Sequence, residues 1–200
     1  MKKLIITLAT LASSLALVAQ TKVVENPETD AIYRLPLENG SKVVATTLTP
    51  LELGLARSLN TVGFCAWELT TSTENDVVAP RAGIVEEVTE SKVIILHEDG
   101  IYSILSRLGS VCVEQGASVK SGDKVGTTSL SKITNKWRVW IEVLHLRSNP
   151  NYGELALSGT HENLKQYINP IFTTKQKCKV QLTDGGSYTV KARTWCWPWE

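Results

Sequence analysis

The sequence predicts a mostly β fold in which antiparallel strands pack in two layers, as a sandwich or a flattened barrel. Turn residues interrupt the chain at close intervals from about residue 62 onward, and Val, Ile and Thr are frequent between them. Asp99-Gly100 is a favoured hairpin dipeptide between two apolar runs. Both alternating sets of side chains in residues 93–96 are apolar, so this strand should lie inside with both faces covered.

The N-terminus has the three parts of a secretory signal peptide. Two lysines form a positive head, residues 4–18 are apolar apart from Thr and Ser, and polar sequence begins after Ala19 or Gln20. The apolar stretch is shorter than the roughly 20 residues of a membrane span, and no cysteine stands near the cleavage point to accept a lipid. We therefore expect residues 1–20 to be removed and the product to be periplasmic or secreted, with no membrane span. An uncleaved anchor is the alternative.

The charges of the chain are nearly balanced, with 21 basic and 20 acidic side chains. Loss of the two leader lysines changes the formal net charge from +1 to −1. Such a balance offers no electrostatic footprint for nucleic acid or for an anionic membrane surface. We therefore expect neither as a partner.

Residues 21–55 read as a lead-in to the main domain. Short strands are expected at residues 32–35 and 41–47, separated by a turn. Pro50 after a Thr cap favours one or two helical turns over residues 50–57.

From about residue 62 the chain reads as a succession of strands. A short helix is expected over residues 162–168, ended by Asn169-Pro170. Residues 175–200 should form a C-terminal hairpin around a turn at 184–186, followed by a Trp-rich tail. The expected strands of the middle region occupy residues 61–69, 76–80, 83–89, 92–97, 101–105, 111–113 and 137–146.

Four cysteines in an exported chain allow three disulfide pairings. A hairpin centred on residues 184–186 places Cys178 opposite about residue 192, which argues against a bond between Cys178 and Cys196. Free buried thiols are an equal expectation for Cys65 and Cys112.

An ordered series of glycine and apolar motifs runs through the middle of the chain. In chain order the motifs are Val78-Ala79-Pro80-x-x-Gly83-Ile84-Val85, Val93-x-Ile95-x-His97-x-x-Gly100, Tyr102-x-x-Leu105-x-x-Leu108, Val113-x-x-Gly116-x-x-Val119-x-x-Gly122-x-x-Val125-Gly126, Ile141-Glu142-Val143 and Asn169-Pro170. This series resembles the M23 peptidase family, the lysostaphin/LytM-type zinc endopeptidases of bacterial cell walls. The resemblance covers residues 56–174. It implies an antiparallel sheet of LytM/M23 type (a duplicated hybrid motif) whose groove carries a zinc ion.

The zinc ligands of active family members are a His, an Asp four positions later, and the second His of a His-x-His motif, while two further His assist the chemistry. On this alignment the His-x-His falls on the segment from Arg138 to Trp140, and the other assisting His falls on Arg107. The first motif falls near Phe64 and Glu68. Trp cannot ligate zinc, and Arg is a permanent cation that repels it. We therefore expect no catalytic residue and no metal or other cofactor at these positions.

Five of these positions should converge on a vestigial groove with a role in ligand binding: Phe64, Glu68, Arg107, Arg138 and Trp140. A Trp between guanidinium groups suits a sugar ring or a carboxylate-bearing peptide. Alternatively, Trp140 fills the empty metal pocket while the Arg residues pair with Glu68. The sequence leaves both interpretations open.

Three histidines remain elsewhere in the chain, at His97, His145 and His161. An active zinc metalloendopeptidase with displaced ligands would need two of them beside an acidic side chain. Glu142 and His145 are three apart on one strand and so point to opposite faces. Unrelated packing roles are the simpler interpretation.

The tail ends in Trp195, Trp197 and Trp199, which fall on one face if the chain is extended. Such a stripe serves either as a partner-binding strip or as a strand docked on its own domain.

Together these features predict an exported, catalytically inactive M23/LytM-like protein of the cell envelope. Its partner would be peptidoglycan or a cell-wall hydrolase that it regulates. The alternatives are an active zinc metalloendopeptidase of peptidoglycan with displaced ligands, the only case that needs zinc, and a structural envelope adaptor.

Overall fold

The computed structural model describes residues 31–53, 64–146 and 165–191. Every regular element in these ranges is a strand, which confirms the predicted mostly β class. The strands are β1 (Ile32–Arg34), β2 (Lys42–Thr47), β3 (Ala66–Thr71), β4 (Asp76–Val78), β5 (Gly83–Thr89), β6 (Lys92–Leu96), β7 (Ile101–Ser106), β8 (Leu108–Val111), β9 (Ser118–Val119), β10 (Lys124–Leu130), β11 (Trp137–Leu146), β12 (Lys165–Tyr167), β13 (Ile171–Thr173) and β14 (Gly186–Thr189).

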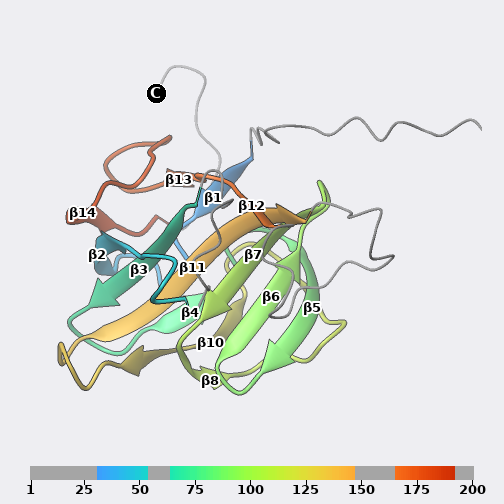
Figure 1. Cartoon of the computed structure of the whole chain (residues 1–200), viewed down its shortest axis with the longest axis horizontal. Helices are drawn as coiled ribbons and strands as arrows, with labels where there is room; N and C mark the ends of the chain where they lie inside the picture. The colour runs from blue at the N-terminus through green and yellow to red at the C-terminus, as the bar shows by residue number, and fades with distance from the viewer. Residues whose placement is uncertain (1–30, 54–63, 147–164, 192–200) are drawn as a thin grey trace, which may run out of the picture.

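The main sheet is antiparallel and runs in the order β14-β2-β3-β11-β7-β6-β5-β9. Its longest strand, β11, lies between β3 and β7 and is drawn in orange in Figure 1. Successive β11 side chains alternate between the two faces of the sheet. Val139, Ile141 and Val143 enter the main core, whereas Trp140 and Leu144 belong to smaller clusters on the opposite face.

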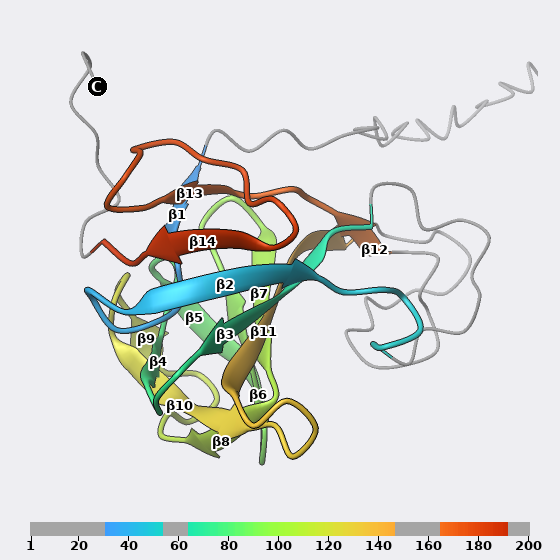
Figure 2. The ribbon, with the colours of Figure 1, turned by 90° about the vertical axis from the view of Figure 1, so that its left-hand side faces the viewer.

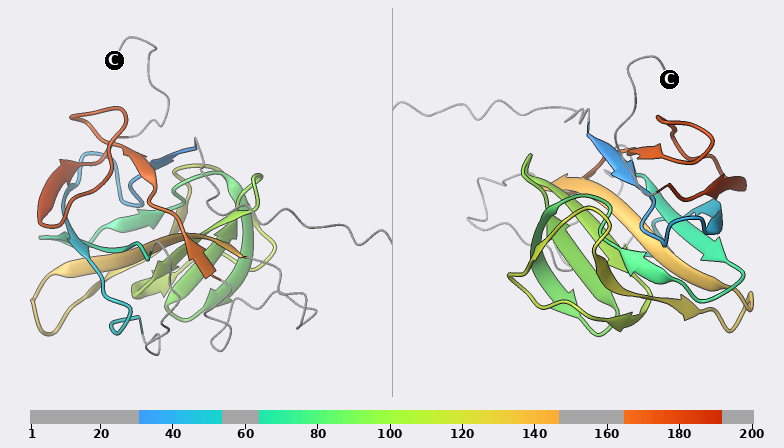
Figure 3. Two further views of the ribbon diagram at one scale, coloured as in Figure 1. Left: turned by 45° about the horizontal axis from the view of Figure 1, so that its top comes forward. Right: turned by 180° about the vertical axis from the view of Figure 1, so that it is seen from behind.

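A second layer consists of β10 with its antiparallel neighbours β4 and β8. It is joined to the main sheet where Ser129 of β10 pairs with Arg138 of β11 (Figure 3). The main core lies between these layers, because Val77, Leu108 and Val125 of the second layer pack in one cluster with the inner side chains of the sheet. This arrangement is the two-layer antiparallel architecture that the sequence predicts.

β1 and β13 form a small parallel sheet that lies above β14 and β2 in the view of Figure 2. Tyr33 and Phe172 on these two strands are fully buried, with ring centroids 6.3 Å apart. β1, β2 and β14 therefore tie the expected lead-in and C-terminal segments to the rest of the fold.

The β6–β7 hairpin has the turn that the dipeptide Asp99-Gly100 predicts. Gly100 has φ +76°, a conformation that favours glycine, and its N–H donates to the His97 carbonyl at 3.0 Å. On β6, Val93 enters the main core while Ile94 packs in the opposite cluster. Both faces of this strand are covered, as expected.

The helix expected over residues 162–168 is wrong within the described residues. The end of the segment 162–168 is the strand β12, which pairs with β11 and places the Tyr167 hydroxyl 3.1 Å from a Glu142 carboxylate oxygen. Tertiary pairing here overrides a short local helix pattern. Of the one or two turns expected after Thr49, one turn is present, closed by hydrogen bonds between Thr49 and Glu52. Residues 54–57 of that segment lie outside the described part of the chain.

The C-terminal hairpin is also wrong in its pairing. The turn exists, since Gly185 has φ +71° and the Gly186 N–H donates to Thr183 O at 2.9 Å. The strand that follows, β14, pairs with β2 rather than folding back on residues 178–182. Val180 instead bridges to Phe172. Pairing with the edge of the main sheet therefore replaces the local hairpin pairing that was expected.

Cys65 and Cys112 are free thiols, whereas Cys178 is in a disulfide. Cys196 is the only other cysteine of the sequence and lies outside the described residues. The expectation that Cys178 and Cys196 do not pair therefore stays a prediction, although the hairpin on which it was based is absent, because β14 pairs with β2. The expected signal peptide (residues 1–20) also lies outside the described part of the chain. None of the described residues belongs to a helix long and apolar enough to cross a membrane.

Candidate functional site

The candidate site lies on the face of the main sheet that points away from the main core. Cross-strand partners share a face of a sheet. In one row across the sheet, Trp140 of β11 pairs with Glu68 of β3 on one side and with Ser106 of β7 on the other. In the next row, Arg138 pairs with Thr70. The register therefore places Trp140, Glu68 and Arg138 on the same surface.

Glu68 is the acceptor at the centre of this surface. Its Oε2 accepts a hydrogen bond from the indole Nε1 of Trp140 at 2.7 Å and a second from an Arg138 guanidinium nitrogen at 3.2 Å. The side chains of Arg138 and Glu68 are 24% and 16% exposed, so this ion pair is largely sheltered from solvent. A charge-assisted hydrogen bond is stronger than a neutral one. The carboxylate is therefore fixed by two donors.

Arg107 approaches Trp140 from the connection between β7 and β8. Its guanidinium carbon lies 4.5 Å from the centre of the Trp140 ring, within the range of a cation–π contact. Arg107 has φ +60°, which costs a residue with a Cβ about 1 to 2 kcal/mol. The Ser129 hydroxyl donates to the Arg107 carbonyl at 2.6 Å and helps hold this backbone in place. The guanidinium of Arg138 lies 5.8 Å from the same ring.

Phe64 closes the apolar end of the surface. It packs with Leu48, Ala66 and Trp140 in one cluster and lies 4.8 Å from the Tyr167 ring in the next. All five residues that the sequence predicts for the groove are therefore brought together: Phe64, Glu68, Arg107, Arg138 and Trp140.

The burial of Trp140 and the partners of the two Arg residues agree only partly with the packing interpretation of the groove. Trp140 is only 7% exposed, and Arg138 pairs with Glu68, as the packing alternative expects. Arg107 departs from that alternative, because it is exposed and contacts the Trp140 ring rather than Glu68. The cluster thus has a packed base with an exposed cation above it. A role in ligand binding stays a prediction.

These residues do not fit the zinc ion that the family resemblance implies. Among the described residues of this cluster, the metal-binding group at the centre is the Glu68 carboxylate, and its Oε2 is already bound to two donors. Two guanidinium groups face the same ring and would repel a divalent cation. Among the described residues, no group of three or more His, Cys, Asp or Glu side chains is arranged to hold a metal. No reaction step through zinc follows from this donor set.

His97 has a structural role. It is 2% exposed, and its Nδ1 lies 2.9 Å from the Ala82 carbonyl, which can only accept. Nδ1 therefore carries the proton, and Nε2 accepts from the Ser103 hydroxyl at 2.7 Å. The pKa of His97 is lowered to about 4, mainly by burial; the hydrogen bond to Ala82 opposes this shift and the charge of Arg81 contributes to it. His145 is half-buried at the end of β11, and His161 lies outside the described residues.

Glu142 and Tyr167 form a pair on this face that no motif of the sequence indicates. Glu142 is 7% exposed and lies on the same face as Trp140, two residues further along β11. Its carboxylate accepts from the Tyr167 hydroxyl at 3.1 Å. The i, i+2 relation to Trp140 is a signal that places Glu142 on this face.

Residues 66–152 match the model of peptidase family M23. This segment contains β3 to β11, so the predicted resemblance is confirmed there. No curated protein matches the sequence.

Three solved structures are similar at low levels. Pseudoalterin, an M23 metalloprotease from the deep sea, has a TM-score of 0.45 at 13% identity, covering 82% of this chain and 98% of its own. The SpoIIQ–SpoIIIAH pore-forming complex has a TM-score of 0.45 at 17% identity, covering 70% and 89%. Lysostaphin has a TM-score of 0.38 at 14% identity, covering 64% and 54%. At these scores the structural likenesses carry no functional conclusion.

Proposed function

We propose that this protein, whose residues 66–152 match peptidase family M23, is an exported and catalytically inactive protein of the cell envelope that binds peptidoglycan. The observation that supports inactivity most directly is the double hydrogen bond of Glu68 with Trp140 and Arg138. This interaction occupies the surface where the resemblance would place a zinc ion. A site of that kind needs an open coordination position and a metal-bound water, and this donor set supplies neither.

The exposed part of the cluster supports a binding role. The guanidinium of Arg107 lies over the Trp140 ring at the surface. The Arg107 backbone is strained at a position where glycine would not be. Strained residues are enriched at functional sites. A guanidinium supported on an aromatic ring suits a carboxylate-bearing peptide. Peptidoglycan contains such peptides, and the family match points to it as the ligand.

Two features support action outside the cytoplasm. The N-terminal sequence has the order of a secretory signal. Cys178 is in a disulfide, a bond that persists in oxidising compartments and is rare in the cytosol. A role in regulating a cell-wall hydrolase shares this location and would use the same surface.

The test is co-sedimentation of the mature protein with purified peptidoglycan sacculi. We expect wild-type protein to sediment with the sacculi and the Arg107→Ala variant to lose at least half of the bound fraction. Lys120→Ala is the matched control, because Lys120 is exposed, carries the same charge and lies away from the cluster. Equal binding by all three proteins would remove the cluster from the proposal. Stoichiometric zinc together with chelator-sensitive cleavage of the sacculi would overturn it in favour of an active metallopeptidase.

If the protein regulates a hydrolase instead, sacculi alone will not retain it. Addition of the protein would then change the rate at which a cell-wall hydrolase releases muropeptides. The structural-adaptor alternative depends on the tail with Trp195, Trp197 and Trp199, which lies outside the described residues. Removal of residues 195–200 tests it, since an adaptor would lose its complex while its melting temperature stays the same.

A further inference from the structure

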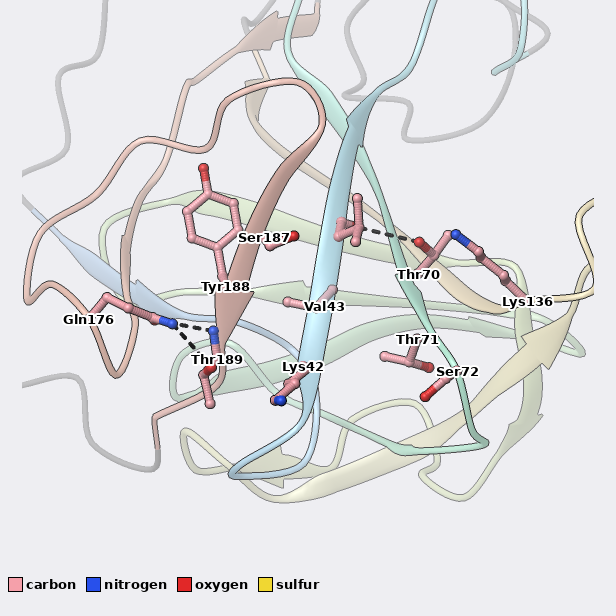
Figure 4. A pocket seen from close by; sticks show the side chains of 11 residues that line it. Lys42, Val43, Thr70, Thr71, Ser72, Lys136, Gln176, Ser187, Tyr188 and Thr189 are labelled. Atoms are coloured by element: carbon pink, nitrogen blue, oxygen red, sulfur yellow. Dashed lines mark hydrogen bonds between the residues drawn. The ribbon is translucent and has the colours of Figure 1, made fainter.

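A hollow of about 430 Å³ lies over β2, between β14 and β3. Lys42 and Val43 on β2 lie between Gln176 and Thr189 on one side and Ser72 on the other (Figure 4). The volume falls within the range of about 300 to 1,000 Å³ that is typical of small-ligand sites. The lining residues are Lys42, Val43, Val44, Thr70, Thr71, Ser72, Lys136, Gln176, Ser187, Tyr188 and Thr189.

The hollow lies on the same face of the sheet as the Trp140 cluster. Arg138 pairs with Thr70, Thr70 pairs with Val44, and Val44 pairs with Ser187. Because cross-strand partners share a face, this row leads from the cluster to the floor of the hollow without crossing the sheet. The next pair along these strands, Val43 and Tyr188, also lines the hollow and packs with the main core, so the hollow extends to the edge of that core. The hollow is thus a continuation of the vestigial groove, and β14 supplies its far edge.

The hollow carries positive charge and no negative charge. Lys42 and Lys136 are both exposed, neither forms an ion pair with a described residue, and no Asp or Glu lines the hollow. Arg107 adds a third exposed cation on the adjoining cluster. The single carboxylate of that cluster, Glu68, is already paired with Arg138. A ligand that lies along this face therefore meets three cations that can bind its acidic groups.

Polar groups of the hollow are partly fixed and partly free. The Gln176 side chain is held at both ends by Thr189, donating to the hydroxyl at 3.1 Å and accepting from the backbone N–H at 3.2 Å. One N–H of its amide group remains for a ligand. Ser72 and Ser187 are exposed, and their hydroxyls make no hydrogen bond with a described residue. Such groups orient a ligand that the lysines attract.

The spacing of the strands sets the length of the ligand. From β11 to β14 there are three interstrand steps of about 4.8 Å each, or about 14 Å in total. An extended peptide advances about 3.4 Å per residue, so about four residues span the face from the Trp140 cluster to Ser187. This row of residues runs across the strands. Lys42 and Lys136 each lie two positions along the chain from a residue of the row, so side chains of a peptide bound along the row can extend towards them.

We propose that the hollow between β14 and β3 is a second subsite of the groove and that it binds the carboxylates of an acidic peptide of about four residues. The origin of that peptide in peptidoglycan rests on the proposed function above. The hollow, its cations and its continuity with the cluster do not depend on that function.

Isothermal titration of the mature protein tests this subsite with a defined probe, the peptide acetyl-Ala-Glu-Ala-Glu-amide, and with its Gln analogue. We expect the Glu peptide to bind at least about tenfold more tightly than the Gln peptide, since charge-assisted hydrogen bonds are lost in the analogue. The double variant Lys42→Gln/Lys136→Gln should weaken binding of the Glu peptide by a similar factor. The control Lys120→Gln/Lys179→Gln removes the same charge from exposed positions outside the hollow and should bind as wild type does.

Several outcomes would overturn the subsite. They are equal affinity for the two peptides, equal affinity of the two double variants, and full displacement of the Glu peptide by an equal concentration of inorganic phosphate. Co-sedimentation with sacculi distinguishes failure of the subsite from failure of the proposed function. Retention on sacculi that depends on Arg107, together with peptide binding that does not depend on Lys42 and Lys136, would overturn the subsite and leave the proposed function standing. Lysine-dependent binding of the peptide without any retention on sacculi would sink the peptidoglycan proposal and leave the subsite standing.

Discussion

Trp140 and Glu68 are cross-strand partners on β11 and β3, and the Trp140 indole donates to the Glu68 carboxylate at 2.7 Å. The Glu68 carboxylate is the acceptor of a packing interaction. Both donors bind Oε2, so a zinc ion at that oxygen would have to displace the indole and the Arg138 guanidinium. The contact therefore links the stability of the groove to the hydrogen bonding of the Glu68 carboxylate.

Replacement of Trp140 by Phe should measure this link. The Trp140→Phe variant keeps a ring in the cluster but removes the hydrogen bond to Glu68, and a hydrogen bond to a charged group contributes about 1.5 to 3 kcal/mol. We expect the free energy of unfolding in urea to fall by about that amount. The double variant Trp140→Phe/Glu68→Gln should cost less than the sum of the two single variants, because both remove one interaction. Additive losses would show that the hydrogen bond is not the source of the effect.

Arg107 should show the cost of its backbone conformation. At φ +60° a residue with a Cβ is strained, whereas glycine is not. We expect Arg107→Gly to be more stable to urea than Arg107→Ala by about 1 kcal/mol, although both lose the contact with the Trp140 ring. Both should bind sacculi equally poorly. An alanine variant at least as stable as the glycine variant would mean that this backbone is not strained.

His97 should make stability depend on pH. Burial holds its pKa at about 4, below its ordinary value of 6.5, with opposing effects from Arg81 and Asp99. The unfolded chain then binds more protons, so the contribution of neutral His97 is complete above pH 6.5 and is lost as the pH falls from 6.5 towards 4. The shift corresponds to about 3 kcal/mol.

The pH effect is measured by urea denaturation of wild type and His97→Gln at pH 7.5 and pH 4.5. Carboxylates contribute to both proteins, so the difference between them isolates His97. We expect the wild type to lose more stability than the variant over this interval. Equal losses would contradict the assignment of His97 as a buried neutral group.

The strands of the middle region could be predicted from the sequence because their patterns are local. β5 and β11 have the predicted bounds, and the turn at Gly100 follows from its dipeptide. The partners of the terminal strands could not be predicted. β14 lies on β2, about 140 residues earlier in the chain, and no local pattern of Gly186–Thr189 identifies that distant edge.

The five groove residues could be placed together because the family spacing converts sequence positions into neighbours on one face. What spacing could not supply is how their side chains interact. The sequence left open whether Arg107 pairs with Glu68 or lies against the Trp140 ring, and the structure places its guanidinium 4.5 Å from the ring centre. The hollow over β2 was missed for a similar reason. Its floor joins β2 to β14, a pairing that the predicted hairpin excluded.

The thiols should react in a fixed order. Burial raises the pKa of Cys65, which slows formation of its thiolate, while Cys112 is exposed. In the folded protein we expect iodoacetamide to label Cys112 well before Cys65. In denaturant without reductant, mass spectrometry should count two labelled thiols, rising to four after reduction. Three or more labelled thiols before reduction would contradict the disulfide at Cys178.

Restoring the family's ligand types should create a zinc site in this groove. Phe64 and Trp140 pack in one cluster, and Glu68 lies within hydrogen-bond distance of Trp140, so the three family ligand positions converge here. The triple variant Phe64→His/Arg138→His/Trp140→His would supply three imidazoles, of which those at positions 64 and 140 would join the Glu68 carboxylate as ligands, and it would remove the Arg138 charge beside them. We expect the variant, and not the wild type, to melt at a higher temperature with added zinc, since binding to the folded state alone stabilises it. A matched rise for wild type would show that its own side chains already bind zinc. No rise for a folded triple variant would show that the three positions, although adjacent, do not meet at one point.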